Sequence, residues 1–560
     1  MSSSYRSLGA FSSGALWVRR GVARAYRLVA GHRLESALLT AVGAVGAWLR
    51  FSNFQNPGGW DSDQGSQMLA LWHAVQTRQL PQLGPGASVG GFHHGALYYD
   101  LLLPSAWLGN GDPRWVQAEL SLLGLLMIPV LWWVARSMAG RAAGLITALL
   151  TAVLASTVNF STFIWNPTMV GFGAAIVLLG VWQAWHSRRP SWWVVAAAGL
   201  AVAGQAHVLA WVLAVPVVLA WLADLRRNSG PERRRVLRWA LVGAALIVVT
   251  YLPLVAYELT HGFSETRGIL HFIFKGSGAA YAQGPASRLA IAWLRCIAWP
   301  LTGWPLYFND PMTVPIGAAT ALSVGLAWRV LTSVRGAKVS PSVGEPSPTT
   351  DRPAVTVRDG AIFLAVSLGA MIAVLGLFVR NVSEFNPPGE QYHIGLDAFV
   401  IVAVGLVLGA VWNVGAVRSL LRLAGRILTL AAVVGLVAWN SNELPRQTTD
   451  DQSWLAAQHA ATRIEADAHG GSIGNAVLPS TMNFDTYEYP LVHDGAATTS
   501  VAQAQIVVVL CYSSLVADCD GGAEQAWVAS NLAGARLDLI DTFEAQSDRT
   551  IGVFERAPSP

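Results

Sequence analysis

The sequence predicts an all-α polytopic membrane protein with about eleven transmembrane helices, followed by a small extracytoplasmic α/β domain. Of 560 residues, 53% are hydrophobic and only 12% are charged, which is too apolar for a soluble protein. Largely uncharged stretches recur from residue 36 to residue 440, and about 20 such residues cross ~30 Å of hydrocarbon. Residues 441–560 instead hold 16 acidic residues against five arginines, about −11, whereas the first 440 residues carry about +15.

The membrane domain, residues 35–440, is predicted from its apolar segments in chain order. The uncharged run 192–222 would form a helix of about 46 Å, which is too long for one span. We therefore place a tight outer turn at Gly204-Gln205-Ala206-His207. The predicted spans lie near 36–49, 117–135, 142–158, 168–186, 192–205, 207–223, 239–257, 312–328, 360–379, 395–412 and 424–440.

Arginine predicts the orientation of these spans, because short cytoplasmic loops carry an excess of basic residues. The tail 1–34 is basic and lacks a cleavage pattern, which indicates a cytoplasmic N-terminus. Loops 135–141, 186–191 and 224–238 are also basic. The stretch 286–308 contains Arg288 and Arg295, and we predict that it forms an interfacial helix on the outer surface. The proline-rich linker 337–358 then lies in the cytoplasm, and the C-terminal domain lies outside the plasma membrane.

The domain 441–560 alternates helical and strand patterns. Helices are predicted over 454–466 and 523–532, and strands over 505–511, 535–544 and 549–556. An oxidising compartment would permit a disulfide between Cys511 and Cys519, although two separate thiols remain the alternative. Cys296 is predicted to be a buried thiol.

Polar residues gather at the predicted outer ends of the spans. Ionisable groups at a membrane are costly to keep, so their convergence predicts a functional site. For any one of them, ordinary solvation in a loop is the alternative. They are Asp61, Asp63, His93, His94, Asn166, Gln205, His207, Glu258, Tyr392 and His393.

The first outer loop, residues 51–116, carries motifs that resemble those of a known family. They read Trp60-x-Ser62-Asp63-Gln64, Leu83-Gly84-Pro85 through His94-Gly95-x-Leu97-Tyr98-Tyr99, and Gly111-Asp112-Pro113. Weaker matches are Ile164-Trp165-Asn166-Pro167, Gln205-x-His207, Tyr251-x-Pro253 and Tyr257-Glu258. The pattern resembles the bacterial GT-C glycosyltransferases of the protein O-mannosyltransferase and aminoarabinose transferase group. The resemblance covers residues 35–440 and is best over 60–115.

The resemblance implies an inverting transfer of a sugar from a polyprenyl-phosphate carrier to a hydroxyl of a lipid, glycan or protein acceptor. A carboxylate of the first outer loop would accept the hydroxyl proton, and phosphate needs no acid to leave. Asp61 and Asp63 lie about 200° apart on a helix, so both should not face one substrate. Asp63 matches the family's acidic position and is preferred; for Asp61 the alternative is a helix N-cap.

The remaining site residues are predicted to bind substrate. Asn166 stands where a carboxylate is expected and cannot act as a base, and His94-Gly95-Ala96 replaces an expected His-Pro-Pro. Cations near the outer surface would hold the carrier phosphate or, alternatively, only lipid headgroups. The predicted binding residues are His94, Tyr98, Asn166, Gln205, His207, Glu258, Arg267, Lys275, Arg295, Tyr392 and His393.

No cluster of residues has metal-site spacing, so no divalent metal is expected, and no nucleic-acid partner is expected either. Two other classes of function compete with sugar transfer. A secondary transporter or lipid flippase would place acidic sites near the bilayer midplane in paired halves. A membrane-anchored sensor would explain the outer domain but not the Asp63 loop.

Overall fold

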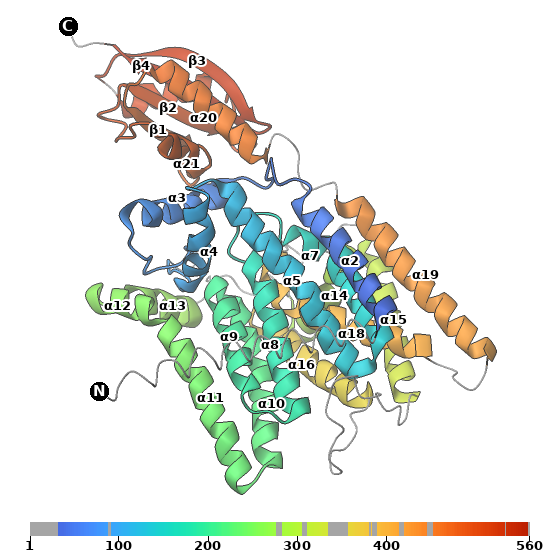
Figure 1. Cartoon of the computed structure of the whole chain (residues 1–560). Coiled ribbons are helices and arrows are strands. Elements are labelled where there is room, and N and C mark those ends of the chain that lie inside the picture. The colour runs from blue at the N-terminus through green and yellow to red at the C-terminus, as the bar shows by residue number, and fades with distance from the viewer. Residues whose placement is uncertain are drawn as a thin grey trace, which may run out of the picture.

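A computed structural model describes residues 32–87, 91–275, 283–304, 311–333, 357–379, 382, 389–413, 419–444, 452–532 and 534–557. A bundle of helices makes up most of the molecule, and a small sheet domain stands at one end of it (Figure 1). Nearly all of the predicted cytoplasmic tail and of the linker 337–358 lies outside the described residues.

Every apolar segment predicted to span the membrane is helical. The bundle contains α2 (Arg33–Phe51), α5 (Pro113–Ala139), α6 (Arg141–Val153), α8 (Thr168–Ser187), α9 (Trp192–Ala206), η1 (Val208–Leu213) with α10 (Ala214–Arg227), α11 (Gly230–Thr250), α15 (Thr313–Ser333), α16 (Val357–Phe378), α18 (Asp397–Asn413) and α19 (Ser419–Glu443). The predicted break in the run 192–222 is present, because α9 ends at Ala206 and η1 begins at Val208.

Fewer than the eleven predicted spans are long enough to cross a membrane as a single helix. Within the described residues, seven helical segments are long and apolar enough to cross a membrane, and the bent pair α11 and α12 (Leu252–Thr260) makes eight. Three shorter apolar helices, Arg141–Val153, Trp192–Ala206 and Thr313–Ala327, occupy the other predicted positions. The 15 residues of α9 measure about 22 Å, which is less than the ~30 Å hydrocarbon core.

Further helical elements lie between and beside these spans. They are α3 (Ser62–Thr77), α4 (Leu97–Leu108), α7 (Ala155–Asn159), α12, α13 (Ser264–Lys275), α14 (Pro285–Thr302), η2 (Glu390–Tyr392) and η3 (Ile394–Leu396). The predicted interfacial helix is α14. It touches the bundle where spans end, since Ser156 donates to the carbonyl of Pro300 and Asn440 to that of Leu301.

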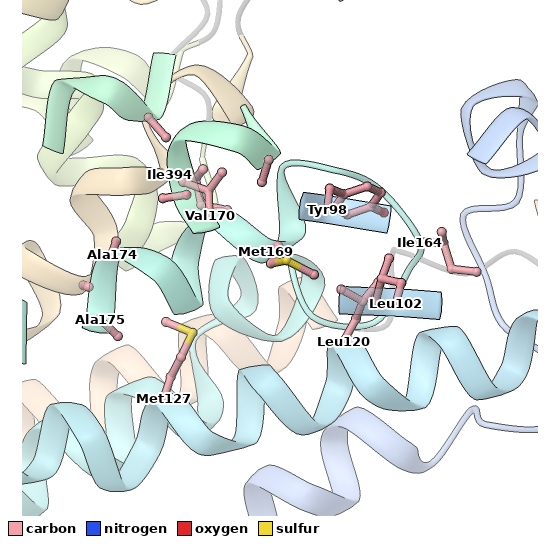
Figure 2. Packing of buried hydrophobic residues seen from close by; sticks show 14 of the residues in the cluster. Tyr98, Leu102, Leu120, Met127, Ile164, Met169, Val170, Ala174, Ala175 and Ile394 are labelled. Carbon is pink, nitrogen blue, oxygen red and sulfur yellow. The ribbon is translucent and has the colours of Figure 1, made fainter. Parts of the chain in front are cut away.

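Close helix packing gives the bundle a dense core. In α18, a Cβ on Gly409 would lie 2.7 Å from the backbone nitrogen of Ala143 in α6, so only glycine permits this approach. Side chains from α4, α5, α8 and η3 meet in the core shown in Figure 2, where Leu102, Leu120 and Met169 are buried. Tyr98 of the first outer loop belongs to this core, which packs α4 against α5 and α8.

The C-terminal residues form the predicted α/β domain. Its sheet has the order β1-β2-β4-β3, with β1 (Ile473–Leu478) parallel to β2 (Ile506–Tyr512), and with β4 (Arg549–Arg556) antiparallel to both β2 and β3 (Leu537–Gln546). Its helices are α20 (Trp454–Ala468), α21 (Asp485–Asp494) and α22 (Gly522–Asn531). Strand β1 and helix α21 were not predicted from the sequence.

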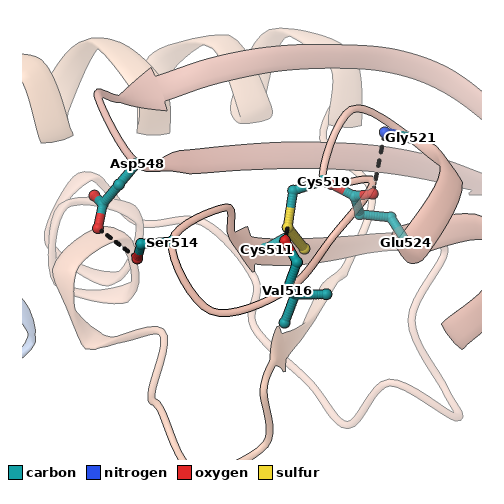
Figure 3. Close-up of a disulfide and its surroundings, with 7 residues drawn as sticks. All are labelled: Cys511, Ser514, Val516, Cys519, Gly521, Glu524 and Asp548. Atoms are coloured by element: carbon teal, nitrogen blue, oxygen red, sulfur yellow. Dashed lines mark hydrogen bonds between the residues drawn. A yellow bond between two sulfur atoms is a disulfide. The ribbon is translucent and has the colours of Figure 1, made fainter.

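The cysteines of this domain are paired. Cys511 at the end of β2 and Cys519 before α22 form a disulfide across a separation of eight residues (Figure 3). The prediction of a disulfide is therefore confirmed over the alternative of separate thiols. Cys296 is buried in α14 and unpaired, as predicted.

Candidate functional site

The N-terminus of α3 places the candidate base. Asp61 is the N-cap of the helix: its carboxylate accepts from the backbone N–H of Ser62, while the Gln64 side chain accepts from the backbone N–H of Asp61 at 2.9 Å. This reciprocal capping fixes the first turn, which contains Asp63. Asp61 also pairs with Arg549 of the C-terminal domain at 2.9 Å. The capping role, given as the alternative for Asp61, is therefore present, and Asp61 as a second candidate base stays a prediction.

Asp63 lies beside the second outer loop. Its carboxylate accepts a hydrogen bond from the indole Nε1 of Trp165 at 2.9 Å. The side chain is exposed to solvent. Desolvation by the surrounding protein nevertheless raises the pKa of Asp63, and the charge of Asp61 raises it further. The hydrogen bond from Trp165 lowers the pKa, but the net change is an increase. A carboxylate with a raised pKa is a stronger proton acceptor than an ordinary aspartate and remains open to a substrate.

Gln67 connects three of the outer elements. It lies one turn after Asp63, on the same face of α3. Its Oε1 accepts from the hydroxyl of Tyr98 at 2.6 Å, and its Nε2 lies 3.5 Å from Oδ1 of Asn166. Asn166 in turn donates to the carbonyl of Ala206 at 2.7 Å. These buried bonds hold the first, second and third outer loops together around Asp63.

The third outer loop brings Gln205 and His207 to the same place. Gln205 accepts from the backbone N–H of Leu97 at 3.3 Å and donates to Thr250 at 2.7 Å. The ring of His207 lies 5.3 Å from that of His94 and 6.0 Å from that of Tyr392, between ring centroids. Polar residues from four of the five predicted outer loops therefore lie together.

Both imidazoles of this pair are neutral at pH 7. Burial, followed by the charges of His207 and His93, lowers the pKa of His94 to about 3. Burial lowers the pKa of His207 to about 4. These rings can orient hydroxyl groups as neutral donors or acceptors, but they supply no positive charge for a phosphate.

The contacts of Glu258 are with backbone groups of a neighbouring helix. Its carboxylate accepts from the backbone N–H groups of Glu265 at 2.7 Å and Thr266 at 3.2 Å, and so caps the start of α13. Glu265 reaches back to His93, whose backbone N–H and ring it contacts. Glu258 is thus linked by contacts, through the start of α13, to the loop that carries His94.

The two predicted cations whose side chains the structure describes, Arg267 and Arg295, lie in different surroundings. Arg267 is exposed on α13, while Lys275 ends that helix and its side chain lies outside the described residues. Arg295 is fully buried and donates to the carbonyl of Val382 at 3.1 Å, so contact with lipid headgroups is wrong for this residue. His393 is also buried, with its Nδ1 3.8 Å from Oδ1 of Asp397, while the ring of its neighbour Tyr392 lies beside that of His207.

Sequence reasoning missed Gln67, Trp165 and Glu265 as site residues. The spacing of Gln67 from Asp63 was the available signal, because residues four apart share a helix face. Trp165 lay inside a motif that was read only for Asn166. Within the described part of the chain, no group of three or more His, Cys, Asp or Glu side chains could hold a metal ion.

Comparison with solved structures identifies the fold. The chain is similar to ArnT from Cupriavidus metallidurans bound to undecaprenyl phosphate, with 13% identity, a TM-score of 0.55, and coverage of 94% of this chain and 98% of that one. The apo form of the same protein gives 12% identity, a TM-score of 0.56, and coverage of 92% and 98%. No family model and no curated protein sequence matches the chain. The fold is thus the GT-C fold of membrane glycosyltransferases, as the motifs implied.

Proposed function

We propose that this chain is a membrane glycosyltransferase that moves a sugar from a polyprenyl-phosphate carrier to an acceptor hydroxyl. The observation that supports this most is the convergence of Asp63 with polar residues of three further loops, in a chain with the ArnT fold. That ArnT structure was bound to undecaprenyl phosphate, which supports a carrier of this class. The site lies at one end of the bundle, whereas a transporter would need it near the midplane.

In the proposed reaction, the acceptor oxygen forms a bond to the anomeric carbon while the bond from that carbon to the phosphate oxygen breaks. The acceptor proton passes to the carboxylate of Asp63, and polyprenyl phosphate leaves with the bonding electrons. Attack from the face opposite the phosphate inverts the anomeric centre. Asn166, Gln205 and His207 would orient sugar hydroxyls as neutral hydrogen-bonding groups. Arg267 and Lys275 remain the candidates for the carrier phosphate, and Arg295 would act only from within the protein.

The site is proposed to open on the outer face of the plasma membrane, with the C-terminal domain on the same side. The basic loops support this orientation. The disulfide between Cys511 and Cys519 also supports it, because such bonds persist in oxidising compartments.

The test is sugar transfer by the purified full-length chain, offered a panel of polyprenyl-phosphate sugars and candidate acceptors, with products measured by mass spectrometry. We expect Asp63→Asn to lower kcat by at least about 100-fold, which is typical for loss of a general base. Asp538→Asn, which changes an exposed carboxylate on β3, is the matched control and should leave transfer unchanged. Unchanged transfer by Asp63→Asn would exclude Asp63 as the base. Movement of intact carrier across vesicles without any transfer would instead favour a flippase.

A further inference from the structure

The C-terminal domain contacts the first turn of α3 on both sides of Asp63. Before it, the indole Nε1 of Trp60 donates to the carbonyl of Thr486 at 2.9 Å. After it, Gly65 packs against the backbone of Asp485, where a Cβ would lie 2.0 Å from the carbonyl oxygen. Helix α21 therefore packs against the turn that carries the candidate base.

Arg549 makes the ionic contact of this interface. Its Nη2 lies 2.9 Å from Oδ1 of Asp61, although it is separated from that residue by most of the chain. The C-terminal domain holds the guanidinium tightly: it lies 4.9 Å over the ring of Tyr512 and 3.4 Å from Asp548, and only 6% of Arg549 is exposed. A cation fixed in this way can orient its partner, because little side-chain freedom remains to be lost.

Asp61 transmits this contact to the helix. The same Oδ1 that meets Arg549 accepts from the backbone N–H of Ser62, and the backbone N–H of Asp61 donates to Gln64. The two capping contacts bracket Asp63. A shift of Asp61 therefore moves the first turn of α3 relative to Trp165 and the second outer loop.

We infer that Arg549 is a positioning residue for sugar transfer: through Asp61 it holds the first turn of α3 so that Asp63 faces the substrate. This inference rests on the proposed role of Asp63 as the base. Under this inference the C-terminal domain contributes a positioning residue to the transferase site. Neither Arg549 nor Asp61 touches the reacting atoms.

The test compares kcat and KM of the full-length chain for four variants. Asp61→Asn keeps an N-cap, since asparagine caps as well as aspartate, but removes the ion pair. Arg549→Gln removes the other partner, a double variant removes both, and Arg549→Lys restores the charge. Arg463→Gln is the matched control, because it breaks the Arg463–Asp541 pair, with bonds of 2.6 and 2.8 Å, inside the same domain.

We expect each single variant to lower kcat roughly 10- to 100-fold with little change in the KM for the donor, because a small misplacement of a catalytic group has effects of this size. The double variant should be no worse than either single variant, Arg549→Lys should recover part of kcat, and Arg463→Gln should behave as the unmodified chain. Asp61 is half exposed, so Asp61→Asn should fold even if Arg549→Gln does not.

Two results would overturn the inference in different ways. If Asp61→Asn keeps full kcat while Asp63→Asn is inactive, the positioning role fails and the proposed function stands. If Asp63→Asn is fully active, the assignment of the base fails and the positioning role fails with it. Additive losses in the double variant would show that Arg549 and Asp61 act independently, and would also reject the coupling.

Discussion

Replacing Gly65 by alanine should separate the C-terminal domain from α3. In a free helix this change is favourable by about 1 kcal/mol, because glycine is a poor helix former. Here the new Cβ would lie 2.0 Å from the carbonyl oxygen of Asp485, 2.3 Å from its carbon and 2.8 Å from the nitrogen of Thr486. All three are backbone atoms, so α21 must retreat by at least about 1 Å to restore ordinary contact.

The cost of that retreat can be bounded. Overpacking a fitted contact costs about 1–3 kcal/mol, so we take about 2 kcal/mol against docking. Since about 1.4 kcal/mol changes an equilibrium tenfold, docking should weaken roughly 30-fold. The bond from Trp60 to Thr486 and the pair of Asp61 with Arg549 would weaken together, because both cross the same interface.

Hydrogen–deuterium exchange measured by mass spectrometry is the suitable assay. Peptides that cover α21 and the start of α3 should exchange faster in Gly65→Ala, while α20 and β2 inside the C-terminal domain should not change. Gly43→Ala in α2 is the matched control, because a Cβ there meets nothing within 4 Å. Equal protection of α21 in Gly65→Ala and the unmodified chain would refute this reasoning about the interface.

Further predictions concern single contacts. In Trp165→Phe, the pKa of Asp63 should rise, because the hydrogen bond from the indole lowers it. The base works when ionised, so the acid limb of the profile of kcat against pH should move to higher pH. An acid limb that does not move would contradict this prediction. Gln67→Leu should lower the free energy of unfolding by about 1–3 kcal/mol, read from thermal unfolding, because it strands buried polar partners. Cys511→Ala with Cys519→Ala should destabilise the C-terminal domain by about 2–3 kcal/mol, as should reductant on the unmodified chain; stability insensitive to reductant would argue against the bond.

The sequence predicted the elements whose formation depends on local sequence patterns. Each apolar segment could be predicted as a helix, because the length of an apolar run and the charge of the adjoining loop are read from neighbouring residues. Helix α21 was missed because Pro490 and the surrounding aromatic residues hide a helical period, and β1 was missed because Gly474 and Asn475 interrupt its apolar run. Both elements are held by tertiary contacts that a single segment does not reveal.

The candidate site divides in the same way. Helix geometry predicted that Asp61 and Asp63 would not both face one substrate, and the family resemblance favoured Asp63; the capping role of Asp61 agrees with that preference. The partner of Asp61 could not be predicted, because no local signal links it to Arg549. The burial of Arg295 was equally hidden, since an arginine in an apolar helix is compatible with a surface or with a buried contact to a carbonyl.

The contact between Asp61 and Arg549 also has a consequence for biosynthesis. Asp61 belongs to the first outer loop and is synthesised before α5 to α19, whereas Arg549 begins the last strand of the sheet. The two can meet only after Arg549 has been synthesised and both segments have reached the same side of the bilayer. A chain that stalls between the end of α19 and Arg549 would therefore hold the spans and Asp63, yet lack the contact of Arg549 at the start of α3.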